Sequence, residues 1–210
     1  AGAQALVGLL LPGAEEHVAV VHRALHGLDV HGAQAAFAAA AVRQRLHAVL
    51  FQHVQQVAVG RHFEAQAVAR GIGRLFARND IWCLPEMPLR NGRRADLMGI
   101  DAKGQLVIVE IKVARADLLG DTKWPDYLDY CDRFYWGLAP HLDRNCMEDP
   151  AFLPERCGLI VADGYDAEVL RPAATVPLAA ARRKAQTERL ARAALRRHHG
   201  FIDPGLAGLV

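Results

Sequence analysis

The sequence predicts an α/β domain in which helices flank a mixed central β-sheet. Three observations predict this class. From about residue 64 onward, apolar patterns of helical period alternate with short runs that are typical of strands. The run at residues 107–111 is apolar on both faces apart from one acid, as expected of a buried central strand. The elements also follow the order helix, three strands, helix, strand, two strands, helix, which is typical of a mixed sheet.

The first elements of the domain have distinct signatures. Residues 64–80 predict a helix with an apolar side and, on another side, arginines spaced four apart. Residues 81–89 predict a strand, and because it contains Pro85 and Pro88, the sequence favours an edge position over the sheet centre. Residues 93–112 then predict two strands joined by a turn.

The later elements complete the domain. A helix is expected to begin near Asp121 or Thr122, with Pro125 in its first turn. The remaining predicted elements are a strand at 134–140, a pair of strands within 157–172 and a closing helix at 178–199.

Residues 1–62 differ in composition from the rest of the chain. They are rich in alanine, hold seven of the ten histidines and contain no Lys, Tyr, Trp, Met or Asn. We interpret them either as an Ala/His-rich helical appendage or as an extension that is not native protein. A histidine metal site is a less favoured alternative, because no carboxylate or cysteine completes a ligand set. Its candidate residues are His17, His22, His26 and His31.

The overall composition is that of a globular protein, with 52% hydrophobic residues and a net charge of +2. Basic charge is concentrated in residues 178–199, which hold seven Lys or Arg and one Glu. The four cysteines show neither zinc-ligand spacing nor a disulfide framework, so we expect a cytoplasmic protein. The apolar run near the first residue is too short to span a bilayer, and we expect no membrane segment. A signal peptide and the oligomeric state stay open.

The predicted hairpin brings two acids together. A three-residue turn at 102–104, with Gly104 in the left-handed region, defines the register of the two strands. In that register Asp96 lies opposite Glu110, and the Cβ atoms of such a pair are about 4.5 to 5.5 Å apart. Lys112, two residues beyond Glu110, shares its face of the strand.

The opposed acids predict a metal site. Two carboxylates held side by side in a buried strand repel, and one is driven toward protonation. A divalent cation such as Mg²⁺ or Mn²⁺ removes this conflict, because it takes carboxylate oxygens and keeps several waters. We therefore expect Asp96, Glu110 and the backbone carbonyl of Ile111 to bind the metal, with Lys112 beside it and Glu86 as a candidate further ligand. The alternative is a solvated ion pair at the rim of an edge hairpin.

The same residues resemble the core motif of the PD-(D/E)XK nuclease superfamily, an acid on one strand followed by acid-X-Lys on the next. The match is Asp96 with Glu110-Ile111-Lys112. Longer segments resemble the MmcB family of proposed DNA-repair endonucleases over about residues 65–200. These segments are "NGRRADLMGIDAKGQLVIVEIK", "DTKWPDYLDYCDRFYWGLAP", "GLIVADGYDAEVLR" and "AARRKAQTERLARAAL".

This resemblance implies a restriction-endonuclease-like fold and Mg²⁺-dependent phosphodiester hydrolysis on DNA, in a nucleoid-associated protein of the DNA-damage response. It implies that Asp96 and Glu110 are metal ligands, that Lys112 is the catalytic lysine and that Glu86 occupies the position of an additional acid. The implied organisation is an extension at 1–62, a PD-(D/E)XK nuclease-like domain at 63–200 and a tail at 201–210. The residues "VAR" after the lysine depart from the small hydroxyl residues that relatives often have, and the first 60 residues have no family counterpart.

Basic residues around the hairpin are candidates for DNA contacts. Arg93 and Arg94 open the strand that carries Asp96, and Lys123 lies just beyond the second strand. Four arginines on one face of the closing helix could neutralise several phosphates, although a solvated basic face is the alternative. They are Arg182, Arg189, Arg192 and Arg196, roughly opposite Ala191, Ala194 and Leu195.

Three further residues near the hairpin have two interpretations each. Trp124 and Tyr127 either stack on splayed bases or pack into the core, and packing is favoured. Asp117 either supplies an outer acid of the site or caps a turn, and capping is favoured.

These observations favour an enzyme, a metal-dependent DNA endonuclease that acts in DNA repair on damaged or branched DNA. The alternative is a catalytically silent nuclease-like module that binds DNA and recruits DNA-repair proteins. A small-molecule or RNA hydrolase with the same metal site stays open, because nothing in the sequence identifies a group that reads a 2′-OH or a base.

Overall fold

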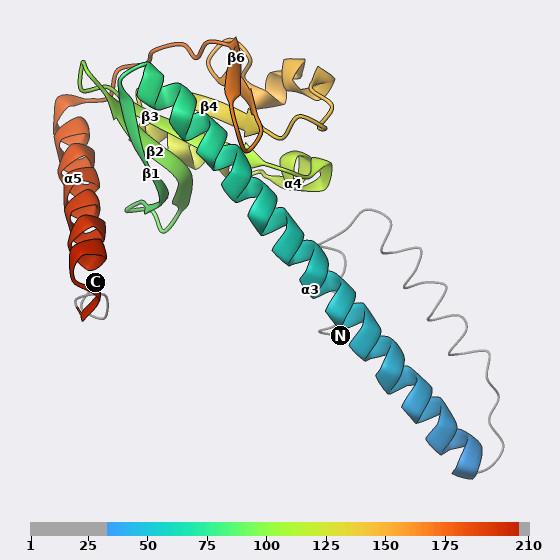
Figure 1. The fold of residues 1–210 in the computed structure, drawn as a ribbon. Helices are drawn as coiled ribbons and strands as arrows, with labels where there is room; N and C mark the ends of the chain where they lie inside the picture. The colour runs from blue at the N-terminus through green and yellow to red at the C-terminus, as the bar shows by residue number, and fades with distance from the viewer. Residues whose placement is uncertain (1–32, 206–210) are drawn as a thin grey trace. The chain divides into compact units, whose positions relative to one another are not determined.

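A computed structural model describes residues 33–205 of the chain (Figure 1). The chain divides between His62 and Phe63 into two compact units. Helix α3 spans Ala33–Arg78, so the predicted helices on either side of residue 62 are one continuous helix. No helix within residues 33–205 is long and apolar enough to cross a membrane. The candidate histidine site lies outside the described residues, at His17, His22, His26 and His31.

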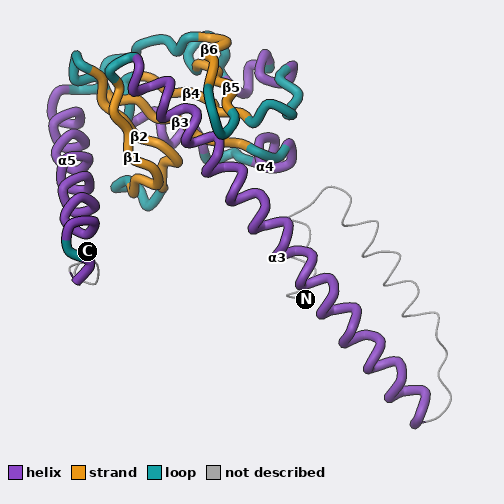
Figure 2. The backbone as a smooth tube through the Cα atoms, viewed as in Figure 1, coloured by secondary structure: helices purple, strands orange, loops and turns teal. Residues whose placement is uncertain are grey.

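The second unit is built on a six-stranded mixed sheet, which confirms the predicted fold class (Figure 2). Its strands are β1 (Ile81–Pro88), β2 (Arg94–Asp101), β3 (Leu106–Lys112), β4 (Arg133–Leu138), β5 (Gly158–Ala162) and β6 (Ala167–Arg171). They pair in chain order. The pairs β1–β2, β2–β3 and β5–β6 are antiparallel, whereas β3–β4 and β4–β5 are parallel.

The β2–β3 hairpin has the predicted turn and register. Gly104 has a φ of +76°, a backbone conformation that glycine adopts without a Cβ penalty. The N–H of Asp101 donates to the carbonyl of Gln105 at 3.0 Å and closes the turn. Leu97 lies opposite Val109, as the three-residue turn requires. All residues of β3 are buried, so the expected central strand is confirmed.

The region predicted as a helix after the hairpin forms two short helices, whereas the closing helix lies close to its predicted bounds. A short helix, α4 (Arg115–Gly120), precedes the 3₁₀ helix η1 (Trp124–Tyr130), and α5 (Ala180–Ile202) closes the domain. Two further 3₁₀ helices, η2 (Asn145–Glu148) and η3 (Pro150–Phe152), lie between β4 and β5. The N-cap position of η1 is Lys123 rather than the predicted Asp121 or Thr122, but Asp121 still accepts the backbone N–H groups of Lys123 and Trp124 just before the helix.

A buried carboxylate anchors the start of α5 to the sheet. Asp132, at the entrance to β4, accepts the backbone N–H groups of Leu106 and Leu178, each at 2.8 Å, and an N–H of Arg183. Further along α5, arginines donate to backbone carbonyls of the edge strand β1: Arg189 to Pro88, and Arg197 to Pro85 and Glu86. The predicted edge position of β1 is confirmed, because β1 pairs only with β2.

Different helices pack against the two faces of the sheet. The last turns of α3 pack on one face, where Gly137 makes room for Ile72, since a Cβ at position 137 would lie 2.8 Å from Ile72 Cδ1. On the other face Trp124 of η1 packs against Trp136, with ring centroids 5.1 Å apart. Glu110 pairs in register with Trp136, so the acid-bearing face of β3 is the one that η1 and α4 cover.

Candidate active site

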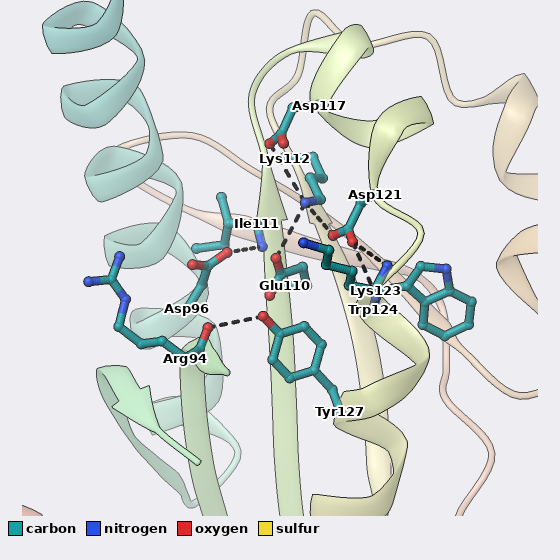
Figure 3. Close-up of polar contacts among 10 residues, drawn as sticks. All are labelled: Arg94, Asp96, Glu110, Ile111, Lys112, Asp117, Asp121, Lys123, Trp124 and Tyr127. Carbon is teal, nitrogen blue, oxygen red and sulfur yellow. Dashed lines mark hydrogen bonds and ion pairs between the residues drawn. The ribbon is translucent and has the colours of Figure 1, made fainter. Parts of the chain in front are cut away.

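The carboxylate of Asp96 lies where strands β2 and β3 separate (Figure 3). The β2–β3 ladder ends at Leu97 and Val109, and the next residues along the two strands are Asp96 and Glu110. Past this point β2 remains paired with β1. The backbone N–H of Ile111 therefore donates to the side chain of Asp96, at 2.7 Å, rather than to a carbonyl of β2. One oxygen of Asp96 is thus fixed by the strand that carries Glu110.

The ammonium group of Lys112 lies among three carboxylates (Figure 3). Its Nζ is 2.7 Å from Asp121 Oδ2, 3.3 Å from Glu110 Oε1 and 3.6 Å from Asp117 Oδ2. The side chain of Lys112 is only 4% exposed and that of Glu110 10%, so these two groups are largely removed from water, whereas Asp117 is exposed. Asp121 is the nearest partner, although sequence alone identifies it only as a cap, because nothing in the pattern shows that residues 113–120 return beside Lys112.

The second oxygen of Glu110 is buried. Oε2 has no hydrogen bond of normal geometry within the described residues, although the Tyr127 hydroxyl interacts with the Glu110 carboxylate. Burial raises the pKa of Glu110 to about 8, the nearby charge of Asp96 adds to the rise, and Lys112 opposes it. The predicted conflict between two neighbouring acids is therefore present, and a cation that reaches Oε2 would relieve it.

The pKa values of Asp96 and Lys112 also rise, for different reasons. Burial raises the pKa of Asp96, although the Ile111 N–H bond and the charges of Lys112 and Arg94 oppose the rise. Burial alone would lower the pKa of Lys112, but the charge of Glu110 and the hydrogen bond to Asp121 outweigh it and the pKa rises. Lys112 thus stays an ammonium group at neutral pH.

The aromatic residues of η1 pack in the core, as favoured. Trp124 and Tyr127 are buried, and the Tyr127 ring stacks on Phe134 with a centroid distance of 6.2 Å. The Tyr127 hydroxyl reaches the edge of the site, where it donates to the carbonyl of Arg94 at 3.1 Å. Burial raises the Tyr127 pKa, and the charges of Glu110 and Asp96 raise it further, so the phenol keeps its proton.

The predicted site residues of β1 and of the start of β2 are in part paired with other side chains. The Glu86 carboxylate is exposed and lies 3.7 Å from an Nη atom of Arg94. Arg93 donates twice to Asp126, from Nε at 3.0 Å and Nη2 at 2.9 Å. Arg94 is exposed. The metal-binding role of Glu86 and the DNA-binding roles of Arg93 and Arg94 stay predictions.

Some candidate DNA contacts near η1 and on α5 are exposed, and others bond to neighbouring protein groups. Lys123 is exposed, and in Figure 3 its side chain is directed toward the carboxylate cluster. On α5, Arg182 pairs with Asp129 at 2.9 Å and Arg189 is tied to β1. Arg192 and Arg196 are exposed.

The packing face of α5 is not the one opposite the arginines. The helix buries Gln186 and Leu190, whereas Ala191 and Leu195 are exposed. The arginine stripe therefore borders the packed face, and this is why two of its members bond to neighbouring backbone or side chains.

The donor set near Glu110 fits a hard cation. Within residues 33–205 no group of three or more His, Cys, Asp or Glu side chains has the geometry of a metal site. Two carboxylates remain, Asp96 and Glu110, and Oε2 of Glu110 has no hydrogen bond of normal geometry among the described residues. Carboxylate oxygens suit Mg²⁺ and Mn²⁺, which fill their other positions with water. The carbonyl of Ile111 as a further ligand stays a prediction.

A comparison with protein-family models identifies the family of this chain. The model of the MmcB-like family, described as DNA repair protein MmcB-like, matches residues 53–205. The chain belongs to the MmcB-like family of DNA repair proteins. The match begins twelve residues before the segment that the sequence resemblance covers, so the end of the N-terminal region also belongs to this family segment. No curated protein matches the chain.

Solved structures give one informative likeness. The chain is similar to the SPO1766 protein of unknown function from Silicibacter pomeroyi, with 40% identity, a TM-score of 0.58, and coverage of 68% of this chain and 93% of that one. A repair endonuclease from Pyrococcus abyssi matches at 21% identity and a TM-score of 0.22, over 33% and 35% of the two chains. SfsA of Pyrococcus furiosus, in complex with Ca²⁺, matches at 12% identity and a TM-score of 0.28, over 56% and 64%. Neither of the last two supports a conclusion about this chain.

Proposed function

We propose that this DNA repair protein is a metal-dependent DNA endonuclease. The observation that carries the proposal is the buried Oε2 of Glu110, which has no hydrogen bond of normal geometry among the described residues, beside a second carboxylate and a buried ammonium group. A protein that only binds DNA has no need to keep two repelling acids on neighbouring strands of its sheet, since such groups destabilise the fold. Their retention is expected where a bound cation and a phosphate use them.

Each member of the cluster has a distinct role in the proposed reaction. Asp96 and Glu110 hold Mg²⁺ or Mn²⁺, and Asp96 is held in turn by the Ile111 N–H. When bound, such an ion stabilises the charge that develops on a scissile phosphate. The Lys112 ammonium positions the attacking water and offsets phosphate charge. The sheet and η1 exclude bulk water from Lys112, which strengthens these interactions.

The exposed basic groups give the proposed DNA surface. Arg94 and Lys123 border the cluster, and Arg192 and Arg196 extend the basic surface along α5. Three other candidate arginines already donate to acceptors in the protein, namely Arg93, Arg182 and Arg189. To contact phosphate, they would have to exchange or share these hydrogen bonds. The proposed substrate is damaged or branched DNA, in keeping with the DNA repair family, and the proposed partners are other repair proteins.

A second candidate is a catalytically silent DNA-binding module that recruits repair proteins. The observation that favours it is the small donor set, because no group of three or more His, Cys, Asp or Glu side chains within residues 33–205 could hold a metal. The two candidates share the DNA surface and differ in whether Glu110 binds metal.

The test is Mg²⁺ binding by titration calorimetry, followed in the same preparation by incubation with flapped, nicked and single-stranded DNA. The variant is Glu110→Gln, which keeps the shape of the side chain and loses its charge. The matched control is Glu168→Gln, an exposed glutamate on the far edge strand. Binding and cleavage that disappear in Glu110→Gln and persist in the control would support the nuclease. Equal heats in all three proteins, without cleavage, would refute it and favour the binding module.

A further inference from the structure

Lys112 is bound more closely by Asp121 than by the glutamate of its own motif. The Nζ to oxygen distance is 2.7 Å for Asp121 and 3.3 Å for Glu110. Asp121 is on neither of the strands that carry the candidate ligands, because it lies between α4 and η1 (Figure 3). Its side chain is 14% exposed, so this ion pair is shielded from solvent.

The two oxygens of Asp121 have separate partners. Oδ2 accepts from Lys112, while Oδ1 accepts the backbone N–H groups of Lys123 at 3.0 Å and Trp124 at 3.1 Å. The helix that follows these bonds is itself fixed, because Trp124 is buried against Phe134 and Trp136. The location of the Asp121 carboxylate is therefore set by backbone and core packing and does not depend on Lys112.

This arrangement controls how strongly Lys112 pairs with Glu110. A lysine stem is flexible, and an ammonium group in a buried carboxylate cluster moves toward the strongest available acceptor. Without Asp121, the nearest remaining acceptor is Glu110, and an ammonium that moved fully onto this carboxylate would compete with a cation for its oxygens. With Asp121 present, Nζ bonds to Oε1 of Glu110, and Oε2 has no hydrogen bond of normal geometry among the described residues.

We propose that Asp121 is a positioning residue that holds the Lys112 ammonium at Oε1 of Glu110, so that the ammonium does not compete with a divalent cation for Oε2. The proposal rests on the proposed nuclease function for its role in catalysis. The positional part, which concerns where the ammonium lies, is a property of the metal-free protein.

The test variant is Asp121→Asn. Asparagine keeps an Oδ1 acceptor for the N–H groups of Lys123 and Trp124, so these hydrogen bonds are retained, but it offers Lys112 no charge. Asp121→Ser, which also offers an acceptor, serves if the first variant melts early. The matched control is Asp117→Asn, because Asp117 is the third carboxylate near Lys112 but is exposed and caps nothing.

The first readout needs neither metal nor activity. It is the ¹⁵N resonance of the Lys112 ammonium in metal-free protein, assigned with Lys112→Met. The resonance is expected to shift in Asp121→Asn, where the ammonium moves fully onto Glu110, and to stay in place in Asp117→Asn. An unchanged resonance in Asp121→Asn would overturn the proposal whatever the protein does with DNA.

The second readout is Mg²⁺ affinity in a double-mutant cycle. Asp121→Asn is expected to weaken Mg²⁺ binding by about tenfold or more, as for loss of a buried charged hydrogen bond. In the Lys112→Met background the same substitution is expected to have little effect, because no ammonium remains to pair with Glu110. A loss of equal size in both backgrounds would show that Asp121 acts directly on the metal, and it would overturn the proposal.

The third readout is the split between kcat and KM in DNA cleavage. Asp121→Asn is expected to lower kcat and leave KM for DNA unchanged, because the residue contacts no candidate phosphate group. Wild-type protein that binds no Mg²⁺ would refute the nuclease function, while the ammonium resonance would still decide the position of Lys112.

Discussion

The Asp96 side chain and the Ile111 backbone are joined by a 2.7 Å hydrogen bond that replaces a rung of the β2–β3 ladder. A buried N–H left without an acceptor destabilises a protein by about 1 to 3 kcal/mol. The carboxylate of Asp96 therefore has a structural role that is separable from metal binding.

Asp96→Ala is expected to lower the free energy of unfolding by about 2 kcal/mol relative to Asp96→Asn, because asparagine still accepts the Ile111 N–H. Both variants remove the charge, so the comparison isolates the hydrogen bond. Both are expected to lose Mg²⁺ binding. Urea unfolding of metal-free protein measures the difference, and equal stabilities of the two variants would contradict the structural role.

The stability of metal-free protein is expected to depend on pH through Glu110. Its pKa is raised in the folded state to about 8, against an ordinary value of about 4.3 in the unfolded chain. The protonated form is therefore favoured in the folded state. The Glu110 contribution is fully present below about pH 4.3 and is lost as the pH rises toward about 8.

The measurement compares wild type with Glu110→Gln by urea unfolding in EDTA, at about pH 5 and about pH 8. The two proteins should be similar at the lower pH, where Glu110 is largely protonated. Glu110→Gln should be the more stable at the higher pH. A stability difference that is the same at both values would show that Glu110 does not titrate in this range.

Lys112→Met is expected to destabilise the protein by about 3 kcal/mol near neutral pH, because it leaves buried Glu110 and Asp121 without their cation. Under the proposed function it also abolishes cleavage. Lys103→Met, in the exposed hairpin turn, is the control and should leave stability unchanged. Chemical unfolding measures the free energy of unfolding of both variants. A Lys112→Met protein as stable as wild type would mean that the ammonium group is not needed to hold the carboxylates together.

Replacing Arg192 and Arg196 together by alanine is expected to weaken DNA binding equally for all sequences. If each contacts one phosphate, the slope of log affinity against log salt falls by about 2. Lys184→Ala, on another face of α5 and paired with Glu188, is the control. Fluorescence anisotropy at several salt concentrations gives the slopes. An unchanged slope in the double variant would assign these arginines to a solvated face.

Local relationships in the site can be predicted from the sequence. The position of Gly104 defines the turn, the turn defines the strand register, and alternation puts Glu110 and Lys112 on one face. Each step depends on residues that are near in sequence, so no tertiary information is needed. The proline positions of β1 are informative for the same reason, since a missing N–H restricts a strand wherever it lies.

The relationships that sequence misses are those between distant segments. Asp121 contacts Lys112 because α4 brings the chain back beside β3. No hydrophobic periodicity in the sequence predicts this contact. On α5 the apolar pattern is misleading, because Gln186 is buried while Leu195 is exposed. Asp132 accepts hydrogen bonds from Leu106, Leu178 and Arg183. In the sequence it cannot be distinguished from the other acids of a charged segment, because only folding brings these three partners to it.

The contacts of α5 with β1 also restrict how the sheet can be extended. A free sheet edge invites strand addition by a partner or a second copy through its open N–H and C=O groups. In β1, Pro85 and Pro88 offer no N–H, and the carbonyls of Pro85, Glu86 and Pro88 already accept from arginines of α5. The opposite edge, β6, contains no proline and exposes Val169 and Leu170. The contacts of α5 and the two prolines thus oppose strand addition at the Pro85–Pro88 end of β1, and β6 has no such obstacle among the described residues.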